Sequence, residues 1–515
     1  MAAEHDDLSR RAVFKQAAVG GVGLVAGSVL TGAGGDQASA AVEQVAAKDE
    51  WLAERASFLS GNRLLKTSGD GSMPPRTLAR GIYRPRSSQE IADLIRSLPA
   101  KTPVASVCGG HESSNAAMFA SSEAIVLDMV HLTSIEFRKD GDRVLVTVGA
   151  GVVFRELVEA VKLQHGALPV GTGPGVGVVG YIVNGGLSGY FSRRLGLLGQ
   201  CVESLTVVTA AGDIRVLAPG EELFTAMLGA GSALGIVVDV TLRMEPESVV
   251  KHAEQRVVSF RTRKEAVEFA RGALRIQREH VLPDDSVSME VVVSGAKVVV
   301  VTFVFYDTFR GSVADFVTPL EELAARLNLP VAMASHWSSW YQTAAALWPV
   351  ITAMKGSPLA MLQHCLGTEG PPDDRILDFI CNTVIARAPL DEATFSIVEI
   401  RTLGGAAASQ GKIPSGNCHH QFFVDLITLY DAKNKTVEER QAIADLTTRI
   451  IDEARHVDGL AVDFSGTHSQ PDDVGLAPSP PMIFGTEAMA KTVQRLKKNV
   501  DPENRFRFHP FAKFL

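Results

Sequence analysis

The chain has 515 residues, of which 46% are apolar, 21% charged and 6% aromatic. This length allows several domains of roughly 150 residues, each able to bury its own core. The net charge of −8, from 58 acidic and 50 basic residues, argues against nucleic acid as a partner. Five cysteines without a C-x-x-C pair are too few for a disulfide scaffold or a structural zinc cluster. We therefore expect a multidomain globular protein with a small-molecule partner.

Residues 1–40 are predicted to be an export signal. Residues 9–15 resemble the twin-arginine motif, an uncharged stretch follows at 16–35, and residues 38–40 form an A-x-A cleavage site. The alternative is a membrane anchor, but a spanning helix needs about 20 strongly apolar residues and this stretch is rich in glycine. We expect export through the twin-arginine machinery to the periplasm or the exterior, without stable membrane insertion.

Short β-branched runs alternate with helical stretches and glycine turns between residues 82 and 246, a pattern that indicates strands packed with helices. Before this region, residues 41–75 are predicted to begin as a helix and end as a loop. The elements expected within it are helices at 90–98 and 153–163, strands at 124–129 and 143–148, and a hairpin between 205–209 and 214–217 that turns at 210–213.

The sequence pattern changes at about residue 247 and again at about residue 456. Longer strands are expected at 291–305 and 393–401, and a basic amphipathic helix near 487–500. The predicted divisions of the chain are an N-terminal helical segment at 41–75 and three further regions at 76–246, 247–455 and 456–515.

Three glycine clusters stand out, at residues 108–113, 171–189 and 229–235. Glycine loops that follow strands allow backbone N–H groups to approach phosphates or a flat ring closely. Residues 175–180 spell G-x-G-x-x-G, which would suggest a dinucleotide-binding crossover. That interpretation is weak, because residues 181–189 contain too many glycines to form the required helix.

Together the clusters and their neighbours resemble the FAD-binding half of the vanillyl-alcohol-oxidase flavoproteins, and most closely the berberine-bridge-enzyme-like branch. The resemblance covers about 70–250 and 456–515. It rests on residues 83–87, 108–113, 127–128, 148–151, 171–189, 207–212, 223–224 and 235–237, and on the tail at 484–487 and 498–506. It implies an α+β protein: a two-lobed FAD-binding domain of the PCMH type at 76–246, a substrate domain with an antiparallel sheet at 247–455, and a C-terminal segment that returns to the FAD domain.

The resemblance also implies which residues hold FAD. They are Cys108, Gly109, Gly110, His111, Glu112, Ser113, Val176, Gly177, Gly180, Gly185, Gly189 and Ile236. His111 occupies the slot whose histidine is bonded to the flavin 8α-methyl group, and the alternative is a free histidine beside non-covalent FAD. Gly173 replaces the cysteine of relatives with two flavin linkages, so a single linkage is expected. Cys201 is interpreted as a small buried residue.

Val176 aligns with a position beside the flavin C4a atom. In the family a small side chain there leaves room for dioxygen, whereas a larger one blocks it. Valine therefore favours an oxidase, and the alternative is that Val176 only packs.

Dehydrogenation requires a base that takes a proton as hydride leaves for the flavin. Many relatives use a tyrosine late in the chain, but Phe464 stands in that slot, which lowers the weight of a carbohydrate-oxidase mechanism. The best candidate for this base is Asp425, Glu399 is a second carboxylate candidate, and His419 could orient the substrate. A strand at 418–426 would place His419 and Asp425 on one face and His420 on the opposite, apolar face.

Each catalytic candidate also has a structural alternative. Asp425 and Glu399 could be ordinary paired carboxylates, with Glu399 serving the strand of Arg401, and His419 could satisfy local hydrogen bonds. No metal site is expected, because alternation separates the two histidines and no third ligand is evident.

The predicted function is an exported FAD-dependent oxidase. It would dehydrogenate a small organic substrate, an alcohol or ring system resembling a secondary metabolite, by hydride transfer to flavin N5, and reduce O₂ to H₂O₂. The alternatives are a dehydrogenase with a non-oxygen acceptor, an oligosaccharide oxidase, and a flavin-binding protein without catalysis.

Overall fold

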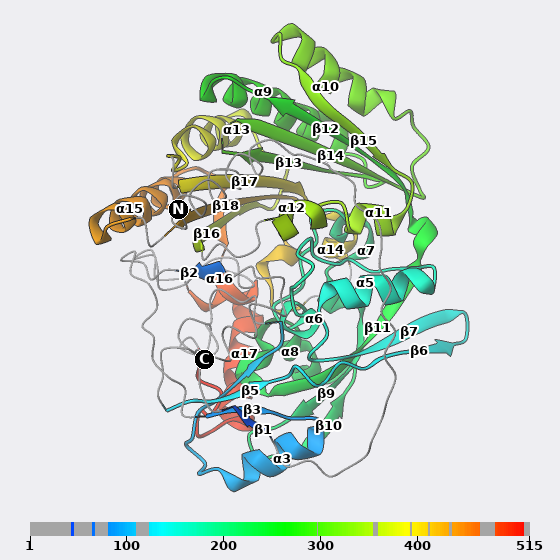
Figure 1. Cartoon of the computed structure of the whole chain (residues 1–515), viewed down its shortest axis with the longest axis vertical. Coiled ribbons are helices and arrows are strands. Elements are labelled where there is room, and N and C mark those ends of the chain that lie inside the picture. Colours follow the sequence, from blue (N-terminus) through cyan, green and yellow to red (C-terminus); the bar gives the residue numbers. More distant parts are fainter. Residues whose placement is uncertain are drawn as a thin grey trace, which may run out of the picture.

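The computed structural model describes residues 43–45, 64–66, 81–109, 123–295, 297–353, 359–391, 394–409, 413–431, 435–463, 479–508 and 515. The predicted signal at 1–40, four residues of the first glycine cluster (Gly110, His111, Glu112 and Ser113) and Phe464 lie outside these residues. Within them the strands form three sheets, and the largest is stacked above the other two in Figure 1.

The first sheet has the order β1-β3-β5-β4. Its strands are β1 (Glu43–Val45), β3 (Gly81–Arg84), β4 (Val104–Val107) and β5 (Ile125–Asp128), of which β3, β5 and β4 run parallel. Helix α3 (Ser88–Ser97) begins where Ser87 Oγ accepts a hydrogen bond from the Glu90 amide, and it buries Ile91 and Ile95. The predicted helix at 90–98 and strand at 124–129 are therefore confirmed.

The second sheet has the order β10-β9-β11-β7-β6, with β8 paired to β11, and every pair is antiparallel. Its strands are β6 (Ile135–Asp140), β7 (Arg143–Gly149), β8 (Gly166–Ala167), β9 (Val202–Val208), β10 (Ile214–Leu217) and β11 (Ile236–Pro246). The helices around it are α5 (Phe154–Leu163), α6 (Val178–Ile182), α7 (Ser192–Leu195) and α8 (Glu222–Leu234). The predicted hairpin is confirmed, and Gly212 supplies the positive φ of +84° in its turn.

The third sheet has the order β15-β12-β14-β13-β17-β18-β16-β19, with β2 paired in parallel to β16 and all other pairs antiparallel. Its strands are β2 (Leu64–Lys66), β12 (Val250–Ser259), β13 (Val287–Ser294), β14 (Val298–Tyr306), β15 (Val331–Trp337), β16 (Leu359–Thr368), β17 (Thr394–Thr402), β18 (Phe422–Asp431) and β19 (Ala461–Asp463). This sheet is the antiparallel substrate-domain sheet that the resemblance implied.

Two predictions about strands and helices are wrong. The strand expected at 291–305 is a hairpin of β13 and β14, because Gly295, with φ of +56°, turns the chain between two valine runs at 291–293 and 298–301. The helix expected early in 41–75 is contradicted at β1 and β2. Both are three-residue strands held by pairing with the edges of distant sheets, and this tertiary pairing overrides the local pattern.

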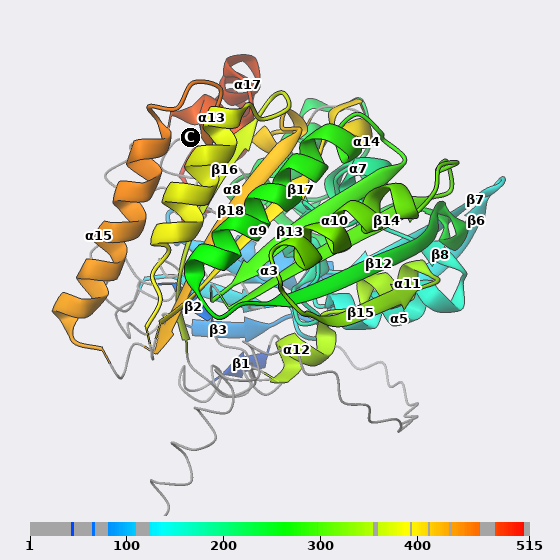
Figure 2. The same cartoon turned by 90° about the horizontal axis from the view of Figure 1, so that it is seen from above.

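Helices cover one face of the third sheet, and the other face is turned toward the first two sheets (Figures 1 and 2). The covering helices are α9 (Arg263–Ile276), α10 (Ala314–Arg326), α13 (Asp374–Phe379) and α15 (Val437–Ala454). Shorter helices lie near the inner face: α11 (Trp340–Ala344), α12 (Trp348–Ala353) and α14 (Gly405–Ser409). The inner face is therefore the one on which substrate-domain side chains can meet the glycine clusters.

The C-terminal region contributes α16 (Pro480–Phe484) and α17 (Glu487–Val500), which confirms the amphipathic helix predicted near 487–500. Helix α17 packs against α8, and Lys497 Nζ donates to the Ala233 carbonyl at 2.8 Å. The Arg505 guanidinium donates to the carbonyls of Ile95 (2.8 Å) and Ala100 (3.2 Å) beside the first sheet. Among the described helices, none combines the length and apolarity needed to cross a bilayer.

Candidate active site

The first two glycine clusters meet backbone to backbone. An ideal Cβ built on Gly109 would lie 2.3 Å from the Gly177 nitrogen, and one built on Gly177 would lie 2.3 Å from the Gly109 nitrogen. Cys108 lies beside both Gly177 and Gly180, with its Cβ 3.8 Å from an ideal Cβ on Gly180. Because real Cβ atoms do not approach backbone atoms this closely, only glycine permits the contact. The structure thus brings together four of the predicted flavin-binding residues.

The second cluster is fixed by backbone hydrogen bonds to the start of α5. The Phe154 amide donates to the Val176 carbonyl at 3.0 Å, and the Val178 amide donates to the Val152 carbonyl at 3.0 Å. Val176 is half-buried at this junction. Ile236 lies elsewhere in the same lobe, at the start of β11, where it is buried in the core and paired with Val208.

The far end of the second cluster touches the substrate domain. An ideal Cβ on Gly185 would lie 3.1 Å from Ser415 Oγ. One on Gly189 would lie 2.7 Å from Glu290 Oε1 and 2.8 Å from Arg401 Nε. The predicted cofactor loop and the predicted catalytic strands therefore meet at Gly189.

Two buried amide side chains next to this contact leave polar atoms unsatisfied. Asn184 Nδ2 donates to the Gly180 carbonyl at 2.8 Å, but its Oδ1 atom lacks a partner among the described residues. Asn417, two residues after Ser415, is buried and has no described partner for either side-chain atom. Buried polar groups are nearly always hydrogen-bonded, so these atoms and the glycine contact fit a flat, polar ligand such as the flavin of FAD.

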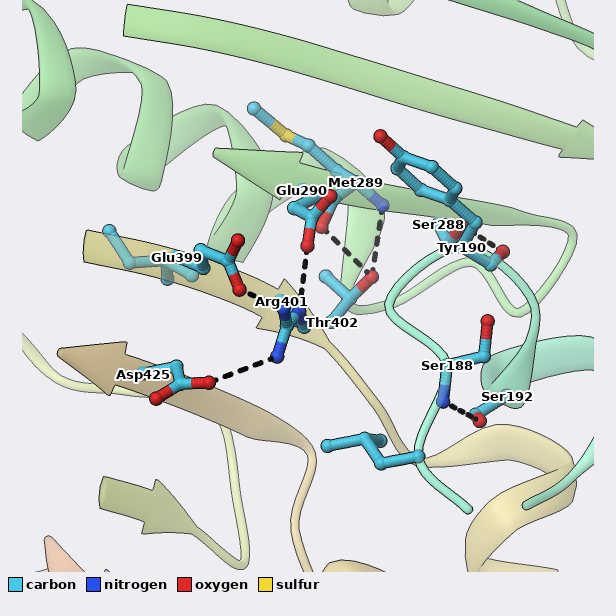
Figure 3. Close-up of polar contacts among 12 residues, drawn as sticks. Ser188, Tyr190, Ser192, Ser288, Met289, Glu290, Glu399, Arg401, Thr402 and Asp425 are labelled. Atoms are coloured by element: carbon cyan, nitrogen blue, oxygen red, sulfur yellow. Dashed lines mark hydrogen bonds and ion pairs between the residues drawn. The ribbon is translucent and has the colours of Figure 1, made fainter. Parts of the chain in front are cut away.

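A buried cluster of one arginine and three carboxylates lies across β13, β17 and β18 (Figure 3). Arg401 Nε lies 2.6 Å from Glu290, and its two Nη atoms face Glu399 and, at 3.6 Å, Asp425. The register pairs Glu290 with Arg401 and Glu399 with Asp425, which places all four side chains on one face. We call these four residues the Arg401 cluster.

Asp425 is held by neutral donors as well. Gln363 Nε2 donates to Asp425 Oδ2 at 2.8 Å, and the Cys365 thiol lies 3.4 Å from Oδ1. The carboxylate is 1% exposed, so its oxygens are engaged within the sheet. The contacts of Asp425 are therefore those of a paired carboxylate, the structural alternative to a catalytic role.

The pKa of Glu399 is raised to about 7, mainly by burial. Arg401 acts to lower this pKa, and the charges of Glu290 and Asp425 act to raise it. Burial lowers the pKa of Arg401, but the attraction of Glu399, Glu290 and Asp425 outweighs it and holds that pKa well above its ordinary value. Burial likewise raises the pKa of Tyr181 and Tyr190, two phenols beside this cluster. These phenols stay protonated at neutral pH.

Glu399→Gln is expected to flatten the dependence of stability on pH. Folding raises the pKa of Glu399 from 4.5 to about 7. The folded state therefore holds a proton that the unfolded chain releases, and the contribution of this group to stability is lost as pH rises through that window. Urea unfolding at pH 5, 6, 7 and 8 measures the effect. The exposed variant Glu503→Gln is the control, and an unchanged pH slope in Glu399→Gln would contradict the assignment.

The strand predicted at 418–426 is wrong in its first half. The chain forms a tight turn over Gly416–Cys418 and β18 begins only at Phe422, so alternation does not apply to His419. His419 is half-buried, and its Nε2 atom lies 3.2 Å from the ideal Cβ position of Gly485. The structure therefore places His419 against the C-terminal region, and it brings Asp425 and Glu399 together.

His420 was expected on an apolar face, and this expectation is wrong. Its Nε2 atom lies 2.6 Å from Asp463 Oδ2, and both residues are buried. The two residues are 43 positions apart, so no local pattern in the sequence could indicate the pair.

Residues 79–218 match the family "FAD binding domain". The chain is 30% identical over 203 residues to the FAD-linked oxidoreductase tazG of Aspergillus terreus, covering 38% of this chain and 40% of tazG. It is 35% identical over 139 residues to (R)-6-hydroxynicotine oxidase of Paenarthrobacter nicotinovorans, covering 26% of this chain and 29% of that enzyme. The chain thus aligns with less than half the length of these curated relatives.

The similarity in structure extends much further. A single-residue variant of berberine bridge enzyme superposes with a TM-score of 0.70 and 18% identity, over 91% of this chain and 96% of that one. The chain is thus a two-domain α+β protein with the fold of these flavoproteins. Residues 79–218 are its FAD-binding domain, and the resemblance to the berberine-bridge-enzyme-like flavoproteins is confirmed.

Proposed function

We propose that this protein is an FAD-dependent oxidase of a small organic molecule, with its active site where the glycine clusters meet the Arg401 cluster. The single observation that carries the proposal is the contact at Gly189. There the FAD-binding domain lies against Glu290 and Arg401, which belong to a buried, charged sheet face. A flavin held by the glycine clusters would have the charges of Glu290 and Arg401 nearby, and such charges tune the reactivity of a flavin.

FAD, when bound, accepts the hydride and passes its electrons to an acceptor. Cys108, Gly109, Gly177 and Gly180 would hold it through their backbones, and His111 would carry a single covalent linkage. Val176 aligns with the family position beside the flavin C4a atom, and its small side chain would leave room for dioxygen as that acceptor. A relative named for 6-hydroxynicotine supports a small organic substrate.

The Arg401 cluster would act on the reaction through its charged groups. Three carboxyl groups face one guanidinium, so acidic groups outnumber the basic group in the cluster. Loss of hydride leaves positive charge on the substrate carbon, and a fixed negative charge in a buried site stabilises it. Export through the signal at 1–40 is part of the same proposal. The twin-arginine route carries proteins that are already folded, which suits a protein that takes up a tightly held cofactor before export.

Acid precipitation of the purified protein tests the proposal first. We expect yellow colour in the pellet and a flavin mass increment on the peptide that contains His111, with both lost in His111→Ala. Substrates are then screened by peroxide release in air. A folded preparation that holds no flavin would overturn the proposal, and flavin that substrate reduces but air reoxidises only slowly would indicate a dehydrogenase instead.

A further inference from the structure

His420 and Asp463 form a buried pair on the edge of the third sheet. His420 directly precedes Gln421 and β18, and Asp463 ends β19, so the two residues flank β16 from either side. Nε2 of His420 lies 2.6 Å from Asp463 Oδ2. The histidine is 6% exposed, and its Nδ1 atom is buried with no hydrogen-bond partner among the residues that the structure describes.

The imidazole lies flat over β16. An ideal Cβ on Gly367 would be 2.5 Å from each of three ring atoms of His420, Cγ, Nδ1 and Cε1, so only glycine leaves space for the ring. The register pairs Gly367 with Phe423, and it pairs Cys365 with both Asp425 and Asp463. Cross-strand partners share a face, as do residues two apart, so the imidazole and the Arg401 cluster lie on the same inner face.

The other proton acceptors that the structure describes on this face are already engaged or protonated. Asp425 is bound by Gln363, Cys365 and Arg401, and Glu399 is paired with Arg401. The tyrosines near the cluster keep their protons because burial raises their pKa values. His420 instead presents an unbonded nitrogen whose ring orientation is fixed by a carboxylate on the other nitrogen, the arrangement that selects one tautomer.

We propose that His420, oriented by Asp463, is the proton acceptor of this site; the inference rests on the proposed oxidase function. The O–H or N–H bond of the substrate breaks, and its proton forms a new N–H bond at His420 Nδ1. The adjacent carbon gives up a hydride to the bound flavin, so the substrate loses two electrons and the flavin gains them. Asp463, on the opposite nitrogen, compensates the charge of the imidazolium.

Stopped-flow reduction of the holoenzyme flavin by substrate, without oxygen, tests the proposal. We expect His420→Ala and His420→Gln to retain FAD and to lower the rate of flavin reduction about 10²–10⁴-fold. Added imidazole is expected to restore part of the rate in His420→Ala, because the substitution opens the space over Gly367. The exposed His456→Ala is the histidine control.

The second readout needs no turnover. In holoprotein with ¹⁵N-labelled histidine, the imidazole signals missing from His420→Gln should show a protonated Nε2 and an unprotonated Nδ1, and Asp463→Asn should alter them. Flavin reduction in His420→Gln within threefold of wild type, or a protonated Nδ1 in the resting protein, would overturn the base assignment while leaving the oxidase proposal intact. A wild-type holoprotein whose flavin no substrate reduces would overturn the oxidase function, and the base role with it.

Discussion

Replacing Arg401 with methionine is expected to lower the free energy of unfolding at neutral pH by about 3–5 kcal/mol. Arg401 is 8% exposed and is the counter-ion of Glu290, Glu399 and Asp425. Without it, three carboxyl groups remain on a buried sheet face with no compensating charge. Removing one member of a buried ion pair costs far more than the pair itself contributes, because the remaining charge cannot reach water.

The matched control is Arg194→Met. Arg194 pairs with Asp307 at 3.1 Å, but both side chains are about one third exposed or more, and such a surface pair contributes at most about 1 kcal/mol. The loss of stability in Arg401→Met should also be smaller at pH 5, because Arg401 lowers the pKa of Glu399. Without Arg401 the folded state takes up a proton at Glu399 more readily as the pH falls. Denaturant unfolding at pH 5 and 7.5 measures both effects, and equal losses in the two variants would contradict the cluster's role.

Gly177→Ala is expected to lower the flavin content of the purified protein about tenfold or more, which is within reach of an overpacking cost of about 1–3 kcal/mol. The added methyl group would lie 2.3 Å from the Gly109 nitrogen and 2.8 Å from Cys108 Cβ. Because atoms of the first cluster stand directly in its way, the two loops must separate, and the proposed flavin contacts separate with them. The ratio of flavin to protein absorbance is the measurement.

Gly370→Ala is the matched control for that substitution. No atom lies within 4 Å of an ideal Cβ on Gly370, so the same chemical change meets open space there. Normal flavin content in Gly177→Ala would show that the contact between the two clusters is not needed to hold the cofactor.

The elements that could be predicted from the sequence are those with complete local signals. Helix α5 shows helical apolar spacing, and the turn at 210–213 has the glycine that its geometry requires. The hairpin at Gly295 escaped prediction because the valine runs at 291–293 and 298–301 dominate the apolar pattern, and the four residues between them form too short a break to outweigh it.

The candidate site was only partly predictable for a related reason. Glu399 and Asp425 could be singled out as chemistry-bearing residues on neighbouring strands, but Glu290 lies 111 residues before Arg401 and no pattern links them. The face predicted for His420 is wrong because the predicted strand begins at Cys418, the last residue of the turn, whereas β18 begins at Phe422. Residues that the fold brings together from distant positions carry no shared signal in one sequence.

The hydrogen bonds of Arg505 constrain the order in which the protein can form. Its guanidinium binds carbonyl groups that precede it by 405 to 410 residues, so a ribosome makes both partners at widely separated times. Strands β12 to β19 of the third sheet are synthesised between the two partners, so the contact cannot form until all of them have been made. This contact can therefore close only after Arg505 has been synthesised, and a nascent chain arrested before Arg505 should be cleaved faster by proteases at residues 95–100.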